Sequence, residues 1–175
     1  MGDAGVMGST DCYLGVDLGT SSCKVVAIDP QGEVLARASA SYPLSTPKPA
    51  WVEQDPEDWV LGAKTAIAQV VDDIGRTTIR SSGLSGQMHG LVAMNCDGAV
   101  LRPAILWNDQ RTERQCQAIT QNAGGPQALL ALTNNPMLPG YTGGKIVWMR
   151  GEEPGLFDQM TIVLNPKDYL RYRLT

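Results

Sequence analysis

Residues 13–28, with the sequence YLGVDLGTSSCKVVAI, constrain the fold of this chain more than any other stretch. Two short apolar runs, 13–16 and 25–28, flank a turn at residues 19–22, a pattern typical of a β-hairpin. A glycine opens the turn and lets the backbone bend without a Cβ clash. The pattern therefore predicts that the folded part of the chain begins with a hairpin.

The turn of this hairpin carries groups suited to bind phosphate. Asp17 ends the first strand, Thr20, Ser21 and Ser22 offer amides and hydroxyls, and Lys24 adds a cation. A carboxylate for a metal ion, a nest of donors and a cation can together cradle the phosphates of a nucleotide. The alternative is an ordinary turn, because the pattern D-x-G-[ST] also occurs in hairpins that bind nothing.

The size and charge of the chain limit the classes of function. Its 175 residues suffice for one ordinary domain, and the 43% that are hydrophobic suffice to fill a core. The net charge of −4 argues against a nucleic-acid partner. No stretch approaches the roughly eighteen consecutive apolar residues of a membrane span, so no membrane partner is expected. Residues 1–12 lack the features of a signal peptide and are expected to form a loose extension.

The cysteines show no metal-binding spacing. Cys12, Cys23, Cys96 and Cys116 form no CxxC pair, and His89 is the one histidine of the chain. This composition predicts no zinc site and favours reduced thiols in a cytoplasmic protein.

A long amphipathic helix is predicted after the proline-broken segment 42–54. Asp55 supplies a capping carboxylate and Pro56 suits the first helical position. Apolar residues then recur every three or four positions until Gly75 ends the helix. They are Trp59, Ala63, Ala66, Ile67, Val70 and Ile74.

Further strands around this helix predict a mixed α/β sheet. Residues 33–41 form a third strand, and residues 79–85 form a buried strand that returns beside the first one. Residues 91–94 and 99–101 flank an Asp-Gly turn, which is a strong signal for a second hairpin.

Two polar clusters, residues 86–90 and 107–111, come directly after strands, where open α/β sheets bind ligands. Donors and acceptors beside a flat apolar wall suit a polyhydroxylated ligand. The alternatives are that Asp109 caps a helix beginning near Arg111 and that His89 satisfies a loop carbonyl. The side chains concerned are Gln87, His89, Asn108, Asp109 and Arg111, with Trp107 as the wall.

Six blocks of sequence resemble the amino-terminal part of the FGGY carbohydrate kinases, and within them the xylulokinases. The resemblance covers residues 13–175, and GQMHG followed by PAILWNDQRT is its most specific part. The blocks are GVDLGTSSCKVVAID, WVEQDPEDW, GLSGQMHGLV, LRPAILWNDQRT, NPMLPGYTGGKIVWMR and LNPKDYLRYRLT.

The resemblance implies a fold and a domain organisation. The expected fold is a ribonuclease H-like (actin-like ATPase) mixed sheet with flanking helices. Residues 13–175 would be the amino-terminal part of the first domain, with the rest of it and the second domain absent. The catalytic base, an aspartate, would then lie beyond Thr175, and the chain alone is expected to be inactive.

The resemblance also implies an activity and its cofactors. The parent enzyme would transfer the γ-phosphoryl group of ATP to D-xylulose, giving D-xylulose 5-phosphate in xylose metabolism, with Mg²⁺. Asp17 resembles the carboxylate that contacts magnesium in catalysis, and Thr20, Ser21, Ser22 and Lys24 match the loop that holds the phosphates. The residues that match the sugar pocket are Gln87, Met88, His89, Trp107, Asn108 and Asp109.

The chain departs from the family pattern at two glycines, Gly144 and Gly151, and differs from the glycerol kinases at Gly140. Gly140 stands where glycerol kinases have a tyrosine, which implies a wider sugar pocket. Gly144 replaces a usual proline and Gly151 a polar residue, and both are expected to loosen a helix. Lys145 falls in the family signature, and Trp148 is expected to lie in the core.

Other functions are left open. They are another FGGY polyol or ketose kinase and an inactive sugar-binding module. An actin-type or heat-shock-type ATPase would share the hairpin, but the GQMHG and WNDQR blocks count against it. A homodimer is also left open.

Overall fold

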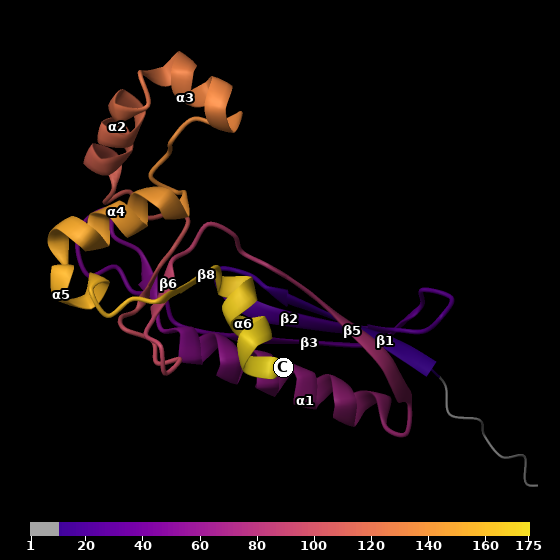
Figure 1. The fold of residues 1–175 in the computed structure, drawn as a ribbon. Coiled ribbons are helices and arrows are strands. Elements are labelled where there is room, and N and C mark those ends of the chain that lie inside the picture. Colours follow the sequence, from indigo (N-terminus) through magenta and orange to yellow (C-terminus); the bar gives the residue numbers. More distant parts are fainter. Residues whose placement is uncertain (1–10) are drawn as a thin grey trace, which may run out of the picture. The chain divides into compact units, whose positions relative to one another are not determined.

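A four-stranded mixed sheet forms the first of two units into which the chain divides (Figure 1). The computed structural model describes residues 11–175. The first unit comprises Met1–Tyr42 with Leu61–Gly86, and the second comprises Pro43–Val60 with Gln87–Thr175. The strands of the first sheet are β1 (Asp11–Leu18), β2 (Ser22–Ile28), β3 (Val34–Ser41) and β5 (Thr78–Gly86).

The strand order of this sheet is β3-β2-β1-β5. The first three strands pair antiparallel, as the predicted hairpin and third strand require, and β5 runs parallel to β1. The return of the chain from the helix to the side of the first strand is therefore confirmed. β1 already begins at Asp11, so the last two residues of the predicted extension belong to the sheet, and residues 1–10 lie outside the described part.

One face of the sheet is buried. Alternate residues of β1 and β2 point to this face, as the period of two requires. Helix α1 (Pro56–Ile74) belongs to the first unit from Leu61 onward, and this part of the helix runs along the sheet (Figure 1). It adds Ala63, Ala66 and Val70 to the buried residues. The buried strand residues are Cys12, Leu14, Val16, Leu18, Cys23, Val25 and Ala27.

The ends of α1 match the prediction closely. The Asp55 carboxylate accepts the backbone N–H of Glu57 at 2.9 Å, which is the predicted cap. Gly75 follows the helix with φ +58°, a conformation that glycine adopts without strain.

The prediction of a buried strand at residues 79–85 is wrong. β5 pairs with β1 at the edge of the sheet, and most of its residues are exposed, including Ile79. The strand carries serines and glycines where a buried strand would carry branched apolar residues.

The second unit contains two small sheets and several helices. β4 (Glu53–Gln54) pairs with β7 (Ala104–Ile105), and β6 (Val92–Met94) pairs with β8 (Ile162–Leu164). The predicted Asp-Gly hairpin is confirmed, because Met94 bridges Val100 and Gly98 has φ +79°. The helices are α2 (Glu113–Asn122), α3 (Pro126–Thr133), α4 (Thr142–Glu152), α5 (Pro154–Phe157) and α6 (Pro166–Leu174).

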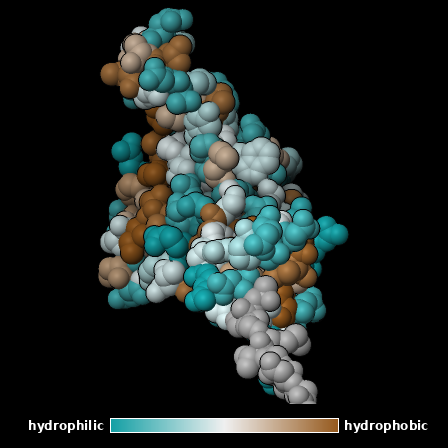
Figure 2. Space-filling view, turned by 90° about the vertical axis from the view of Figure 1, so that its right-hand side faces the viewer, coloured by the Kyte–Doolittle hydropathy of each residue, from teal (hydrophilic) through white to brown (hydrophobic). Residues whose placement is uncertain are grey.

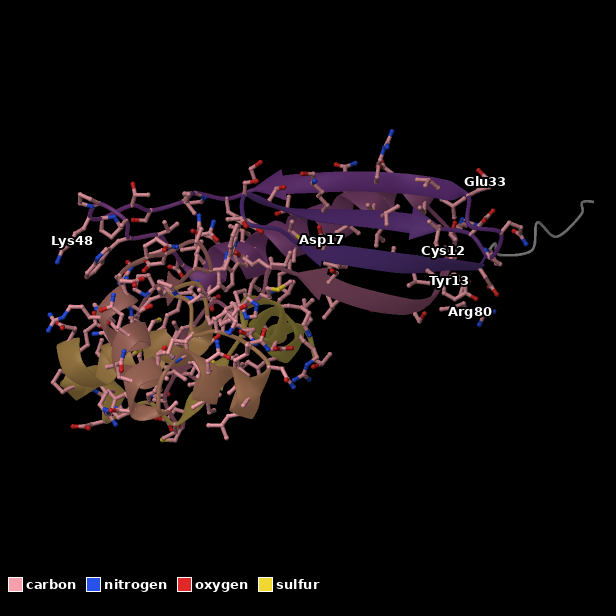
Figure 3. The ribbon with its side chains drawn as sticks, turned by 90° about the horizontal axis from the view of Figure 1, so that it is seen from above. Cys12, Tyr13, Asp17, Glu33, Lys48 and Arg80 are labelled. Atoms are coloured by element: carbon pink, nitrogen blue, oxygen red, sulfur yellow. The ribbon has the colours of Figure 1, made fainter. Side chains whose placement is uncertain are left out.

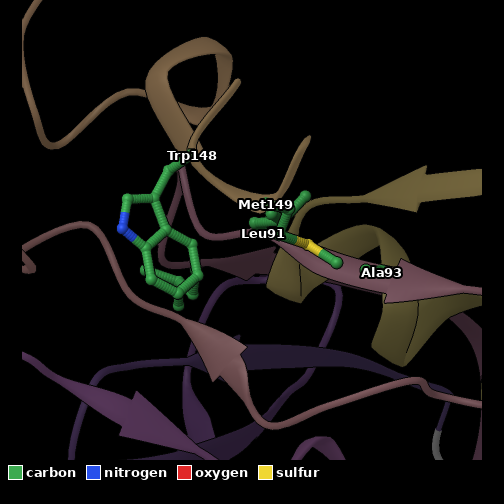
Figure 4. Close-up of a cluster of buried hydrophobic side chains, with 5 residues drawn as sticks. Leu91, Ala93, Trp148 and Met149 are labelled. Carbon is green, nitrogen blue, oxygen red and sulfur yellow. The ribbon is translucent and has the colours of Figure 1, made fainter. Parts of the chain in front are cut away.

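The core of this unit forms around α4. Trp148 and Met149 of this helix pack with Leu91, Ala93 and Ile105 (Figure 4). Trp148 is therefore a core residue, as predicted. Among the described residues, no helix is long and apolar enough to cross a membrane.

Candidate active site

Two of the residues predicted to bind phosphate, Asp17 and Lys24, lie in a polar row across the outward face of the first sheet. Lys24 lies opposite Asp17 on the neighbouring strand, and Ser39 lies opposite Lys24. On the other side of Asp17, Ser85 of β5 is its partner. Directly opposite residues share one face of a sheet, so the row brings a carboxylate, a cation and two hydroxyls together.

This row lies in a groove of about 720 Å³. Two glycines of adjacent strands, Gly15 and Gly83, line the same groove and contribute no side chains. Figure 3 shows Asp17 far along β1 from Tyr13 and Arg80, at the end of the strand that leads into the turn. The groove therefore continues from the polar row over the exposed face of the sheet.

The turn itself is braced by a tyrosine that sequence reasoning missed. The Tyr42 hydroxyl donates to the carbonyl of Gly19 at 2.5 Å, and its backbone N–H donates to Ser21 at 3.3 Å. Burial is the main cause that raises the pKa of Tyr42 well above its ordinary value, so the hydroxyl keeps its proton for this bond. Tyr42 follows β3 in a proline-broken segment, where no local pattern signals a contact with the turn.

The carboxylate of Asp17 is the one predicted metal ligand. Within residues 11–175 no cluster of three or more histidine, cysteine, aspartate or glutamate side chains could hold a metal ion by itself. An exposed single carboxylate fits Mg²⁺, which usually binds through one or two carboxylates together with substrate phosphates and water.

The two predicted sugar-binding clusters are joined by a backbone bridge. Leu91 and Ile105 exchange hydrogen bonds of 2.8 and 3.1 Å in an antiparallel bridge. Residues before Leu91 and residues after Ile105 therefore leave the bridge on the same side. The structure thus places the Met88–His89 turn and the Trp107–Asn108 turn on the same side of the bridge; that they form one sugar pocket stays a prediction.

Met88 and Trp107 present apolar surface. Their exposed fractions are 62% and 47%, which are high for side chains of this size. An exposed indole beside polar groups is a wall on which the C–H face of a sugar can pack.

Two amide side chains of these clusters have unused acceptors. The side-chain oxygens of Gln87 and Asn108 are buried and accept no hydrogen bond from the described residues. The Gln87 amide nitrogen donates to Gln54 at 3.4 Å, which orients the group but leaves its oxygen without a donor. A buried acceptor without a partner costs about 1–3 kcal/mol, so such groups are typical of sites completed by a ligand or by water.

His89 has an unusual backbone conformation. Its φ is +60°, which is uncommon for a residue other than glycine. Its ring lies 4.7 Å from the ring of Tyr141, and among residues 11–175 its imidazole makes no hydrogen bond. The alternative of a histidine that satisfies a loop carbonyl therefore finds no support. Backbone strain of this kind is most often kept at functional sites.

The carbonyl of His89 is held by Lys145 of α4. The Lys145 ammonium donates to this carbonyl at 2.9 Å and also to the carbonyl of Gly140. The side chain is fully buried, and burial is the main cause that lowers its pKa to about 8. The family signature pointed to Lys145, but this contact depends on the tertiary fold.

The Asp109 carboxylate, unlike the exposed Trp107 side chain of the same cluster, is buried and fully hydrogen-bonded within the protein. Both carboxylate oxygens accept bonds from the Arg111 guanidinium at 2.7–3.0 Å, and one also accepts the N–H of Val52 at 2.6 Å. The side chain is 0% exposed. Its predicted sugar contact stays a prediction, and its observed contacts brace the loop.

The capping alternative for Asp109 is met in part, because the Asp109 Oδ1 accepts the backbone N–H of Arg111 at 2.9 Å. The residue in the N-cap position of α2, which begins at Glu113, is however Thr112, whose side chain forms no capping bond. Asp109 also belongs to a buried ionic network, because Arg111 pairs with Glu53 at 2.7 Å as well. Glu53 in turn pairs with Arg102. Sequence reasoning missed this network because Glu53, which joins the two arginines, lies 49 residues before Arg102 in the chain.

Comparison with known proteins settles the family. Residues 12–175 match the model of the FGGY family of carbohydrate kinases, N-terminal domain. The chain belongs to the FGGY family. Its membership rests on almost the whole chain, so the match covers both the first hairpin and the loops around His89 and Trp107.

Several members of the FGGY family are similar to this chain. The xylulose kinase of Escherichia coli K12 is 42% identical over 163 residues, covering 93% of this chain and 33% of that enzyme. The xylulose kinase of Bacillus subtilis 168 is 43% identical over 164 residues, covering 93% and 32%. The chain thus spans about a third of the length of these two relatives.

The fold agrees with solved structures of the family. The crystal structure of a xyloylose kinase from Brucella ovis superposes with a TM-score of 0.84 at 39% identity, over 91% of this chain and 33% of that one. The predicted fold, a mixed sheet with flanking helices of the actin-like ATPase type, is therefore confirmed.

Proposed function

We propose that this chain supplies the phosphate hairpin and the sugar-binding loops of an ATP-dependent xylulose kinase. Such an enzyme transfers the γ-phosphoryl group of ATP to D-xylulose and forms D-xylulose 5-phosphate. The names of the two bacterial relatives support this substrate. The observation that carries the proposal is the pair of buried, unpartnered oxygens on Gln87 and Asn108, because hydroxyl groups of a sugar can donate to both.

The residues of the first unit would act on the phosphates. Lys24 offers positive charge to the nucleotide, and Thr20, Ser21 and Ser22 offer hydroxyls and amides at the turn that Tyr42 braces. Asp17 would hold Mg²⁺ through water, and the ion neutralises charge on the phosphate oxygens when it is bound.

The residues of the second unit would position the sugar. His89 would bond a hydroxyl, and Met88 and Trp107 would pack on the C–H face of the ketose. Phosphoryl transfer depends mainly on such positioning, since the acceptor oxygen must lie in line with the phosphate. A side chain at Gly140 would meet the carbonyl of Trp107 at 2.7 Å, so this glycine permits the close approach of the two turns around the proposed sugar pocket.

A chimaeric enzyme tests this proposal. Residues 12–175 replace the matching segment of the Escherichia coli xylulose kinase, which is 42% identical to them. We expect ATP-dependent turnover of D-xylulose in the range usual for kinases, about 1–100 per second. Glycerol and gluconate serve as competing substrates, and far-UV circular dichroism and a thermal melt verify folding.

Two outcomes of this assay contradict the proposal. A folded chimaera that prefers glycerol or gluconate would assign the loops to another sugar. A folded chimaera without turnover on any of the three substrates would favour a sugar-binding module that has lost catalysis.

A further inference from the structure

Lys145 is a buried cation that forms no direct ion pair within the described part of the chain. Its side chain is 0% exposed, and burial lowers its pKa, an effect that the charge of Asp109 partly offsets. The Asp109 carboxylate itself accepts hydrogen bonds from Arg111 and from the N–H of Val52. Burial of a charge is unfavourable unless specific groups compensate for it, so the groups that Lys145 does contact are informative.

Those groups are two backbone carbonyls from different segments. One belongs to His89 and the other to Gly140, which precedes α4. Gly140 in turn lies against the carbonyl of Trp107, since a Cβ on Gly140 would come within 2.7 Å of that oxygen. The ammonium therefore lies where the His89 turn, the Gly140 turn and the Trp107 turn meet.

The His89 turn needs such a contact because its backbone is strained. His89 has φ +60°, and the next residue, Gly90, packs closely against Pro166. A Cβ on Gly90 would lie 2.6 Å from Cγ of Pro166. With Pro166 on one side and Lys145 bonded to the His89 carbonyl, the peptide after His89 is held from both sides.

The lysine side chain suits this task. Its long stem reaches from α4 to both carbonyls, and its tetrahedral head donates to acceptors that point in different directions. A planar guanidinium of arginine would present its donors in one plane and would need more room.

We propose that Lys145 is a positioning residue: it holds the His89 backbone in its left-handed conformation and couples that turn to Gly140 and Trp107. Lys145 thereby fixes the His89 imidazole beside Tyr141, and in this position the imidazole contacts the ligand. Lys145 itself does not contact the ligand. The assignment of that ligand as a ketose rests on the proposed function. The coupling of the three turns does not rest on it.

The test uses the 175-residue chain and its single histidine, whose imidazole gives one set of NMR signals. The Tyr141 ring at 4.7 Å shifts these signals by its ring current, and a Tyr141→Leu variant calibrates that shift. We expect Lys145→Met to move the His89 signals toward the Tyr141→Leu position. Lys145→Gln retains one donor group and should move them less.

Arg150→Met is the matched control, because Arg150 is an exposed cation on the same helix. It should leave the His89 signals in place. In a calorimetric titration with D-xylulose, Lys145→Met should raise Kd at least tenfold, and Arg150→Met should leave Kd unchanged.

Each result decides the proposal. Unchanged His89 signals in a folded Lys145→Met variant would overturn it. If Lys145→Met and Lys145→Gln both fail to fold while Arg150→Met folds, Lys145 is a core residue and the positioning role is also overturned. If the wild-type chain does not bind D-xylulose but the His89 signals move as expected, the coupling holds and only the sugar assignment fails.

Discussion

At the scale of single residues, the candidate site depends on polar side chains that can form hydrogen bonds but form few of them within the described residues. His89 is the clearest example, because its strained backbone places beside Tyr141 an imidazole that makes no hydrogen bond to any of residues 11–175. Asp109 is the opposite case, since every contact of its carboxylate is internal. This contrast separates residues that can meet a ligand from residues that brace the loops.

His89→Ala should therefore affect binding more than folding. Loss of one hydrogen bond to a sugar hydroxyl costs roughly 1–3 kcal/mol, so the Kd of D-xylulose should rise about ten- to a hundredfold. The melting temperature should change little, because His89 is only half-buried. A calorimetric titration and a thermal melt of the same variant measure both quantities. A destabilised variant with the wild-type Kd would show that His89 serves the fold.

Asp17→Ala should affect turnover rather than sugar binding. The carboxylate lies in the groove of the first sheet, and its loss removes charge that would organise Mg²⁺. In the chimaeric kinase, kcat should fall strongly while the Kd of D-xylulose stays nearly unchanged. A variant that loses sugar affinity but retains turnover per bound complex would place Asp17 in the sugar pocket.

The four thiols should differ sharply in reactivity. Cys96 is exposed, whereas Cys12, Cys23 and Cys116 are buried. Burial, followed by the charge of Asp17, raises the pKa of Cys23 to about 11, so little thiolate is present at pH 8. A thiol-disulfide reagent at pH 8 should label one cysteine rapidly, and Cys96→Ser should abolish that rapid phase. A rapid phase that persists in Cys96→Ser would contradict the burial of the other three.

At the scale of elements, the core of the second unit forms around α4, and two glycines of this helix, Gly144 and Gly151, have different surroundings. Gly144 lies against α2, where an added Cβ would meet Sγ of Cys116 at 2.9 Å and Oγ1 of Thr112 at 3.0 Å. Gly151 has open space around its Cα. Gly144 thus permits close packing of two helices, and the helix runs from Thr142 to Glu152 without a break.

Two alanine substitutions on α4 should therefore have opposite effects. Gly144→Ala forces a shift of α2 or of its side chains and should destabilise the chain by about 1–3 kcal/mol. Gly151→Ala meets nothing and gains helix propensity, so it should stabilise the chain by roughly 0.5–1 kcal/mol. Urea unfolding of both variants measures the difference. Equal effects of the two substitutions would contradict the close approach of α2 and α4.

At the scale of the whole molecule, a considerable amount of apolar surface is exposed. Figure 2 shows apolar side chains at the surface beside polar ones. In the first unit, the groove of about 720 Å³ is lined by Val26 and Val34 in addition to the polar row, and Val34 is 57% exposed. A contiguous apolar surface of this kind binds hydrophobic dyes and promotes association.

The chain should therefore bind anilinonaphthalene sulfonate at this groove. Val34→Lys places a charge at the rim of the groove and should reduce the fluorescence of the bound dye. Leu61→Lys is the matched control, because Leu61 is 65% exposed on α1 and does not line the groove. Equal fluorescence of the two variants, measured at equal protein concentration, would show that the dye binds elsewhere.

The features that the sequence predicted correctly depend on interactions between residues that are close in the chain. The first hairpin, the limits of α1 and the Asp-Gly turn depend on caps, glycines and apolar spacing within about twenty residues. The sequence also indicated that polar clusters follow two strands, as the structure shows. Residue types alone suggested phosphate and a polyhydroxylated ligand, and family resemblance added the identity of the sugar and of the nucleotide.

Long-range contacts decided the rest. The exposure of β5 depends on its position at the sheet edge, and the brace from Tyr42 to Gly19 spans 23 residues. The bond from Lys145 to His89 spans 56 residues, and the contact from Asp109 to Val52 spans 57. Such pairs produce no periodic pattern in the sequence. Each side chain could bond to many chemically equivalent groups of the chain, and only the tertiary fold determines which of them lies within reach. The sequence alone therefore determined which residue types the two loop clusters contain, and tertiary packing determined which of them stay exposed or unpartnered among residues 11–175 and which hold the loops in place.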